Sequence, residues 1–377
     1  MKKHMSWKRV VGAVALGFAF AATTVQAATW SAGNASWGSA DYTWNGDFNG
    51  DGLMDVASGY YGDILTKLST GSSFSATTWY TVNQWNQGVY TFTGDFDGNG
   101  YDDIASAGGG ISYMRLSTGS GFVQSTWSLS SSWGQAAYTF SGDFDGNGYA
   151  DIASAAGGNV YMKLSYGSGF WSSTWYVSSQ WGQGAYTFAG DFNGDGLTDI
   201  GSFAGSTAYM KLSTGSGFSS ETWSIGNATW GQGGYTFAGD FDGDGDDDIA
   251  SGYGGTVHLK LSNGSSYFDV SSFSASASWG QAGYTFAGDF TGDGTADIAS
   301  FAGDVAYIKD PNESCETVEV PYYEGWADGW TGTYGYSCSF WYSGYSQYPV
   351  DWDYYYNDWC YAAYVPQSGT VPLLVCN

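Results

Sequence analysis

The chain has 377 residues and a formal net charge of −26, with 36 acidic residues against 10 lysines and arginines. Such a balance repels nucleic acids and anionic membrane surfaces, because both are bound through basic patches. Neither partner is therefore expected, and the excess of acids needs a different explanation.

Residues 1–27 have the features of a cleaved secretory signal peptide. Four cations stand among the first nine residues, an apolar stretch covers residues 10–22, and Val25-Gln26-Ala27 offers the small residues of a cleavage site. The apolar stretch is too short for a comfortable membrane span, and no later segment qualifies as one. We expect a secreted or periplasmic protein; an uncleaved anchor is the alternative.

One nine-residue acidic pattern occurs six times between residues 28 and 309. The first copy is Asp47-Phe48-Asn49-Gly50-Asp51-Gly52-Leu53-Met54-Asp55, and successive first aspartates are 48, 48, 48, 49 and 49 residues apart. A fixed period of this length indicates a repeat architecture. Side-chain oxygens at positions 1, 3, 5 and 9, with glycine at positions 4 and 6, place hard donors on alternate residues of a tight loop, which suits calcium.

We therefore predict up to six structural Ca²⁺ ions, with position 7 contributing its backbone carbonyl; metal-free Asx-rich turns are the alternative. Ligand counts predict the tightest binding at the fifth loop and the weakest at the sixth. The candidate ligands are Asp47, Asn49, Asp51, Leu53 and Asp55; Asp95, Asp97, Asn99, Tyr101 and Asp103; Asp143, Asp145, Asn147, Tyr149 and Asp151; Asp191, Asn193, Asp195, Leu197 and Asp199; Asp240, Asp242, Asp244, Asp246 and Asp248; and Asp289, Thr291, Asp293, Thr295 and Asp297.

Each repeat predicts four short strands. In the repeat over residues 181–230, runs rich in β-branched and aromatic residues are separated by acidic or Gly/Ser turns, which is typical of antiparallel sheet and of a β-propeller blade. Residues 29–38 match residues 222–231, whereas the sixth repeat ends after its third strand at residues 305–309. We expect an all-β, six-bladed propeller closed by the N-terminal strand; a seven-bladed ring completed by the tail is the alternative.

A tryptophan precedes the first strand of each repeat, and in five repeats a glutamine follows two residues later. An aromatic ring beside an amide suits the apolar face and the hydroxyl edge of a sugar, although such loop tryptophans also pack as core. A second set, which includes Trp30 and Trp79, lies mid-strand and is expected between blades. The candidate sugar-binding residues are Trp85, Gln87, Trp133, Gln135, Trp181, Gln183, Trp230, Gln232, Trp279 and Gln281.

Each repeat also has one cation, 20 residues after its first loop aspartate, for which we expect either a structural ion pair between sheets or a ligand-facing role. Catalysis has little support. His258 is the one histidine after residue 27 and takes the place of a tyrosine in other repeats, and Arg115 is the one arginine there. A sialidase would need an arginine cluster. We expect no enzyme; a glycoside hydrolase or lyase with paired carboxylates is the alternative.

The repeats resemble FG-GAP and VCBS-type calcium-binding repeats. The Trp-x-Gln loops and stretches such as Tyr-Thr-Phe-Thr-Gly-Asp-Phe (residues 90–96) and Leu-Ser-Thr-Gly-Ser-Gly-Phe (residues 116–122) look most like bacterial and fungal propeller lectins. The resemblance covers residues 28–309 and implies calcium in the loop between the first two strands of a blade. The sequence departs from these families in lacking a literal Gly-Ala-Pro and in having six repeats where such lectins often have seven blades.

Residues 310–377 form a compositionally different tail, because all five prolines and all four cysteines follow Lys309. In an exported protein we expect Cys315, Cys338, Cys360 and Cys376 to form two disulfides, with three connectivities open. The many tyrosines and tryptophans of the tail suit either a second carbohydrate surface or a small core.

Taken together, these features favour a secreted, calcium-binding propeller that acts as a multivalent, lectin-like module for glycans or cell-surface polysaccharide. A polysaccharide-active enzyme and a protein-binding adhesion scaffold are the alternatives. The sequence does not identify the ligand, the role of the tail or the oligomeric state.

Overall fold

The computed structural model describes residues 28–31, 42–60, 63–80, 90–129, 138–156, 158–177, 186–226, 235–253, 256–274, 284–302, 305–311, 315–331, 337–344, 350–353, 358–364 and 367–376. Every helix or strand element in these ranges is a β-strand, so the described chain is all-β as predicted. It accordingly contains no helix that could cross a membrane.

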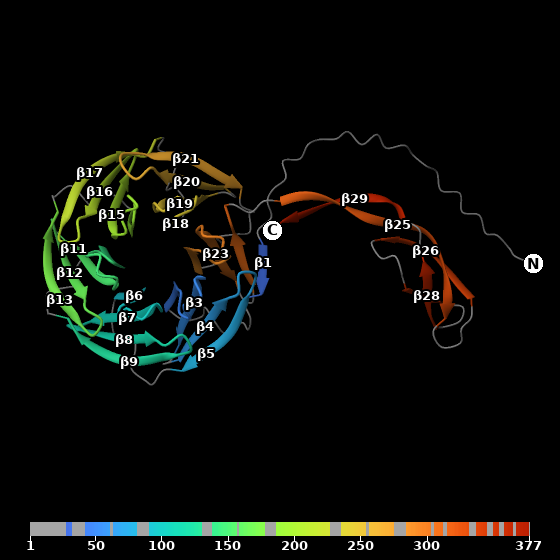
Figure 1. Ribbon diagram of the computed structural model, residues 1–377, viewed down its shortest axis with the longest axis horizontal. Helices are drawn as coiled ribbons and strands as arrows, with labels where there is room; N and C mark the ends of the chain where they lie inside the picture. Colours follow the sequence, from blue (N-terminus) through green and yellow to red (C-terminus); the bar gives the residue numbers. More distant parts are fainter. Residues whose placement is uncertain are drawn as a thin grey trace, which may run out of the picture.

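Six four-stranded antiparallel sheets form a ring (Figure 1). The first two blades are β2 (Tyr42–Gly46), β3 (Asp55–Tyr60), β4 (Asp63–Ser69) and β5 (Phe74–Tyr80), then β6 (Tyr90–Gly94), β7 (Asp103–Gly108), β8 (Ile111–Ser117) and β9 (Phe122–Ser128). The third and fourth are β10 (Tyr138–Gly142), β11 (Asp151–Ala156), β12 (Asn159–Ser165) and β13 (Phe170–Tyr176), then β14 (Tyr186–Gly190), β15 (Asp199–Ala204), β16 (Thr207–Ser213) and β17 (Phe218–Ser224). The fifth is β18 (Tyr235–Gly239), β19 (Asp248–Tyr253), β20 (Thr256–Ser262) and β21 (Phe268–Ser274).

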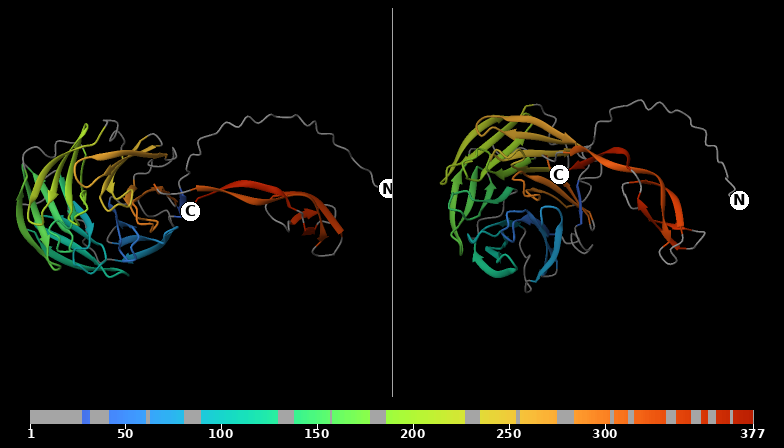
Figure 2. Two further views of the ribbon diagram at one scale, coloured as in Figure 1. Left: turned by 45° about the horizontal axis from the view of Figure 1, so that its top comes forward. Right: turned by 45° about the vertical axis from the view of Figure 1, so that its right-hand side comes forward.

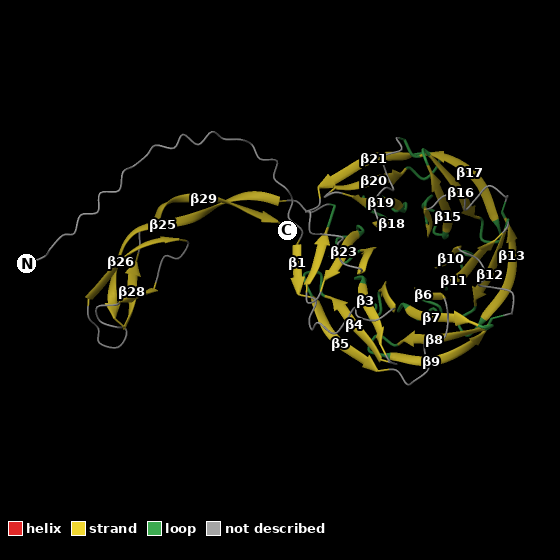
Figure 3. Ribbon diagram, turned by 180° about the vertical axis from the view of Figure 1, so that it is seen from behind, coloured by secondary structure: helices red, strands yellow, loops and turns green. Residues whose placement is uncertain are grey.

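The sixth blade is assembled from both ends of the repeat region. It consists of β22 (Tyr284–Gly288), β23 (Asp297–Ala302), β24 (Val305–Lys309) and the N-terminal β1 (Ala28–Ser31), in the order β1-β24-β23-β22. The antiparallel register of β1 on β24 pairs Ala28 with Ile308 and Ser31 with Val305. The predicted closure of the ring by the N-terminal strand is confirmed (Figure 3).

The blades are held together by aromatic contacts between their outer strands. Trp79 of the first blade packs on Phe122 of the second with ring centroids 5.1 Å apart, and Trp30 of β1 packs on Phe74 of the first blade at 5.4 Å. Such pairs add about 0.5–1.5 kcal/mol to the hydrophobic burial. The mid-strand tryptophans are therefore inter-blade core, as predicted. The same contact recurs at Trp127–Phe170, Trp175–Phe218 and Trp223–Phe268.

The tail forms a sheet of its own, so the seven-bladed alternative is wrong. Its strands are β25 (Cys315–Thr331), β26 (Ser337–Gly344), β27 (Val350–Asp353), β28 (Asp358–Tyr364) and β29 (Gln367–Cys376), and none of them pairs with a blade (Figure 2). The backbone register places Cys315 opposite Cys376, which favours that connectivity, whereas Cys338 lies opposite Gly329 and Cys360 opposite Thr331. The two disulfides stay a prediction.

One end of the ring has both kinds of loop within a blade. The acidic loops join first and second strands, and the Gly/Ser turns join third and fourth strands, so in an antiparallel blade both lie at the same end. All ten predicted Trp and Gln ligand residues lie outside the described residues, as does the predicted signal peptide.

Candidate functional site

Each acidic loop folds around the carboxylate of its first aspartate. In the second loop, Asp95 Oδ1 accepts the backbone N–H groups of Gly98 and Asn99 at 2.7 and 3.1 Å, and Oδ2 accepts that of Gly100 at 2.8 Å. Gly98 and Gly100 have φ of 75° and 86°, which explains glycine at positions 4 and 6. Asp97 and Asn99 at positions 3 and 5 then close two further Asx turns.

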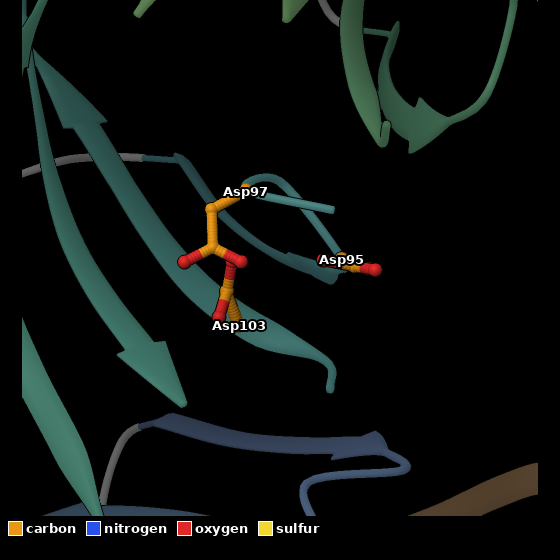
Figure 4. Close-up of side chains that lie close together, drawn as sticks. All are labelled: Asp95, Asp97 and Asp103. Carbon is orange, nitrogen blue, oxygen red and sulfur yellow. The ribbon is translucent and has the colours of Figure 1, made fainter. Parts of the chain in front are cut away.

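This folding brings the predicted ligands together. In the second loop, oxygens of Asp95, Asp97 and Asp103 all lie within 4.8 Å of one another (Figure 4). The third loop forms the same group from positions 1, 3 and 9, and the fifth loop forms one from positions 1, 3 and 5. The first, fourth and sixth loops have an amide or hydroxyl at position 3. The residues concerned are Asp143, Asp145 and Asp151; Asp240, Asp242 and Asp244; and Asn49, Asn193 and Thr291.

The aspartate at position 9 is fully buried and joins the loop to the third strand. Asp103 Oδ2 accepts the amide of Phe96 at 3.1 Å, and Oδ1 accepts that of Ser117 at 2.7 Å. Burial raises the pKa of the Asp103 carboxyl to about 8, and the charges of Asp97 and Asp95 raise it further against the opposing hydrogen bonds. The pKa values of Asp55, Asp151, Asp199, Asp248 and Asp297 are raised to about 8 in the same way, with burial the largest cause.

The donor set fits a hard divalent cation. In the second, third and fifth loops three carboxylates lie close together, and ionised carboxylates at that distance repel one another in the absence of a counter-charge. Three buried oxygens, Asp199 Oδ2, Thr291 Oγ1 and Asp297 Oδ1, have no hydrogen-bond partner. Buried polar atoms without partners are rare in folded proteins and indicate ligands or water.

Position 7 points its side chain toward the preceding loop. The ring of Tyr101 covers Gly50 and that of Tyr149 covers Gly98, so closely that a side chain on either glycine would clash. Leu197, Asp246, Thr295 and Leu53 lie against the position-4 glycines of the other loops in the same way. This agrees with position 7 offering its backbone to a metal.

The six loops form one hydrogen-bonded ring. In every loop the amide at position 8 donates to the carbonyl of position 1 in the preceding blade. Calcium at one loop would thus stiffen a junction between blades. The bonds run from Met54 to Asp289, Asp102 to Asp47, Ala150 to Asp95, Thr198 to Asp143, Asp247 to Asp191 and Ala296 to Asp240, at 2.7, 2.8, 2.7, 2.8, 2.6 and 2.6 Å.

The role of two position-8 acids is not evident from the sequence, because position 8 has no common residue type. A carboxylate oxygen of Asp102 accepts the amide of Asp47 at 2.8 Å, and one of Asp247 accepts that of Asp191 at 2.7 Å. Burial raises the pKa of both carboxyls to about 6. These acids connect neighbouring loops.

The periodic cations are buried side chains of the third strands. Lys163 and Lys211 donate to Ser172 and Ser220 on their own fourth strands, at 2.8 and 2.9 Å. Burial lowers the pKa of both lysines, and no carboxylate contributes to these shifts. Within the described residues, the ion pair expected from the sequence is not found at Lys211.

A central cavity of about 440 Å³ runs along the first strands of the blades. It presents one threonine from each blade, and the hydroxyls of Thr187, Thr236 and Thr285 donate to serines within the wall. His258 lies half-buried on β20, opposite Ser251 and Ser272 in the sheet register.

An aromatic pair unique to the third blade was also missed. Trp171 is 66% exposed and Tyr166 is 45% exposed, with ring centroids 4.9 Å apart and planes tilted by 40°. The equivalent positions of the second blade are Thr118 and Val123. In the sequence these two positions differ from the other repeats, so a pattern of recurring residues does not include them.

Fold and loops define the class: a six-bladed β-propeller with an interlocked ring of acidic loops on one face. FG-GAP-like repeats match residues 47–106, 95–154, 143–202 and 240–300. These matches cover more than half of the chain, which therefore belongs to the FG-GAP-like repeat family. No curated protein sequence matches it.

Two solved structures share the propeller. A lectin from Agrocybe aegerita, described as recognising non-reducing terminal N-acetylglucosamine, has a TM-score of 0.54 and 19% identity over 72% of this chain and 79% of that chain. The Tc holotoxin pore of Photorhabdus luminescens has a TM-score of 0.55 and 12% identity over 75% of this chain and 14% of that chain. At such identities the similarity establishes the fold alone.

Proposed function

We propose that this protein is a secreted, calcium-stabilised propeller that binds glycans at several surfaces without catalysis. The observation that carries the proposal is the similarity to the N-acetylglucosamine-binding lectin, which extends over most of both chains. Calcium would supply the counter-charge that the loop carboxylates need, and the residues at positions 1, 3, 5, 7 and 9 would hold it.

The exposed aromatic pair supports sugar as the ligand class. Tyr166 and Trp171 present ring faces to solvent, and such faces stack on the apolar side of a pyranose. The net charge of −26 disfavours anionic polymers, so neutral glycans fit best. The Trp-x-Gln loops, recurring around the ring, would add equivalent sites and hence avidity.

A glycan array with and without calcium tests the ligand class. We expect repeated hits that share one terminal sugar and that weaken after chelation. Turnover of a polymer would indicate an enzyme instead, and an array without hits would leave a protein-binding scaffold.

Substitutions then separate the surfaces. Trp171→Ala with Tyr166→Ala should weaken binding by about 1 kcal/mol per site with an unchanged melting temperature. Tyr176→Ala is the matched control, because Tyr176 is a 74% exposed ring on the same strand without a stacked neighbour. Trp133→Ala with Trp181→Ala and Trp230→Ala tests the loops; if this variant unfolds, those tryptophans are core, since each such truncation costs roughly 3–5 kcal/mol.

A further inference from the structure

In five of the six blades the third strand ends with a serine, and each of these serines makes two hydrogen bonds. Its amide donates to Oδ1 of the position-9 aspartate, at 2.7 Å from Ser117 to Asp103 and at 2.6–2.7 Å in the other four blades. Its hydroxyl donates to the carbonyl of the position-2 phenylalanine in the preceding blade, at 2.6–2.7 Å. The residue before it is always leucine. The five pairs are Leu68-Ser69, Leu116-Ser117, Leu164-Ser165, Leu212-Ser213 and Leu261-Ser262.

The sixth blade has Asp310-Pro311 in place of Leu-Ser. Proline has neither an amide hydrogen nor a hydroxyl, so both bonds are lost. Asp297 is fully buried and its Oδ2 accepts the amides of Phe290 and Thr291, both at 2.9 Å, but its Oδ1 has no partner. The hydroxyl of Thr291, which stands at position 3 of the same loop, is buried beside this carboxylate and makes no hydrogen bond of good geometry.

The vacated place is close to a second carboxylate. In the antiparallel register of β23 on β24, Ile298 pairs with Lys309, so Asp297 and Asp310 are the next two residues to lie opposite each other. A carboxylate thus replaces leucine in the one blade where a buried carboxylate has lost its donor. Two ionised acids at neighbouring positions repel each other, whereas a cation that accepts oxygen ligands would bind both carboxylates and the hydroxyl of the same loop.

We propose that Asp310, Asp297 Oδ1 and Thr291 Oγ1 complete a calcium-class cation site at the sixth loop, with Asp310 as a ligand from outside the nine-residue motif. The inference rests on the proposed calcium binding of the loops. It also changes the ranking made from ligand counts, because Asp310 supplies the carboxylate that Thr291 removes. The site joins the loop to the residues where the chain leaves β24, next to the closing strand β1.

Calcium titration of the full chain by calorimetry tests the site. Asp310→Asn should weaken one site by about tenfold or more and leave the remaining sites unchanged. Asp269→Asn is the matched control, because Asp269 is an exposed acid on β21 outside the nine-residue motifs, and it should change nothing. Asp310→Glu keeps a carboxylate and should keep all sites.

Thermal melts give a second readout. A residue with a purely structural role would shift the melting temperature in the same direction with and without calcium, whereas a ligand would shift it in opposite directions. Asp310→Asn should raise the melting temperature of the chelated protein, because one of two repelling acids is gone, and lower it in saturating calcium. Asp310→Leu with Pro311→Ser restores the pair found in the other blades and should give a folded protein whose sixth site no longer depends on residue 310.

These experiments distinguish a failure of the Asp310 site from a failure of calcium binding by the loops. If wild type binds calcium and Asp310→Asn has the same sites and affinities, this inference is wrong and the calcium proposal stands. If wild type binds no calcium, both are wrong, while glycan binding is decided independently by the array. A melt shifted in the same direction with and without calcium would also overturn the site.

Discussion

The fifth and sixth blades share a backbone but differ in how their loops are completed. In the fifth blade Asp248 accepts amides of Phe241 and Ser262 at 3.0 and 2.6 Å, and its described residues contain no buried side-chain oxygen or nitrogen without a partner. In the sixth, Thr291 and Asp297 each have one. The fifth blade is continuous in sequence, whereas the sixth joins two distant segments. Ring closure therefore coincides with one departure from the repeat, the replacement of the Leu-Ser pair by Asp310-Pro311.

The largest effect is expected from breaking the closure that distinguishes the sixth blade. Deleting residues 28–34 removes β1, exposes the edge of β24 and uncovers Phe74, so we expect aggregation or loss of folding. Deleting residues 315–377 is the matched control, because no described strand of that region pairs with a blade. Circular dichroism and size-exclusion chromatography measure both, and a stable β1 deletion would contradict the closure.

Chelation tests whether both blades depend on metal. Calcium bound only by the folded protein adds about 2.7 kcal/mol per site when its concentration is 100 times Kd. We expect exhaustive chelation to lower the melting temperature strongly, and calcium to restore it better than magnesium, which tolerates such loops poorly. An unchanged melting temperature would show that hydrogen bonds alone stabilise the loops.

The melting temperature of the chelated protein should depend on pH through the buried aspartates of every blade. Their pKa values are raised from 3.8 to about 8, so the folded state holds protons that the unfolded chain has released. The resulting stability is fully present below about pH 4 and is lost as pH rises through about 8. Melting temperatures of chelated protein should fall from pH 5 to pH 8, and calcium should reduce the fall. A rise over that range would mean that the carboxylates are ionised and stabilising without metal.

A smaller effect is expected from removing, in the fifth blade, the serine hydroxyl that the sixth blade lacks. Ser262→Ala removes the hydroxyl that donates to Phe192 at 2.7 Å and leaves a buried carbonyl unpaired, which costs about 1–3 kcal/mol. Ser219→Ala, at an exposed serine, should stay within about 0.5 kcal/mol of wild type. Denaturant unfolding measures the free energy of unfolding of both variants. Equal effects would show that the Ser262 hydroxyl does not stabilise the contact between blades.

Much of this protein was determined by its sequence. The period of the acidic motif, the strand-length runs and the match between residues 29–38 and 222–231 were sufficient for blade number and closure, because both depend on local patterns. The candidate ligands at positions 1, 3, 5 and 9 were also readable, since an Asx-rich loop with two glycines folds on itself.

Only the tertiary structure decided how neighbouring repeats meet. That Asp102 reaches the loop of Asp47 depends on atoms brought together across two blades. The burial of Lys211 beside Ser220 and the missing donor to Asp297 at Pro311 depend on neighbouring strands of one blade. The same holds for Tyr166 and Trp171, whose exposure follows from the outer edge of one blade. A repeat pattern records what each unit has in common, whereas the contacts found in one blade alone are decided by the positions where the units differ.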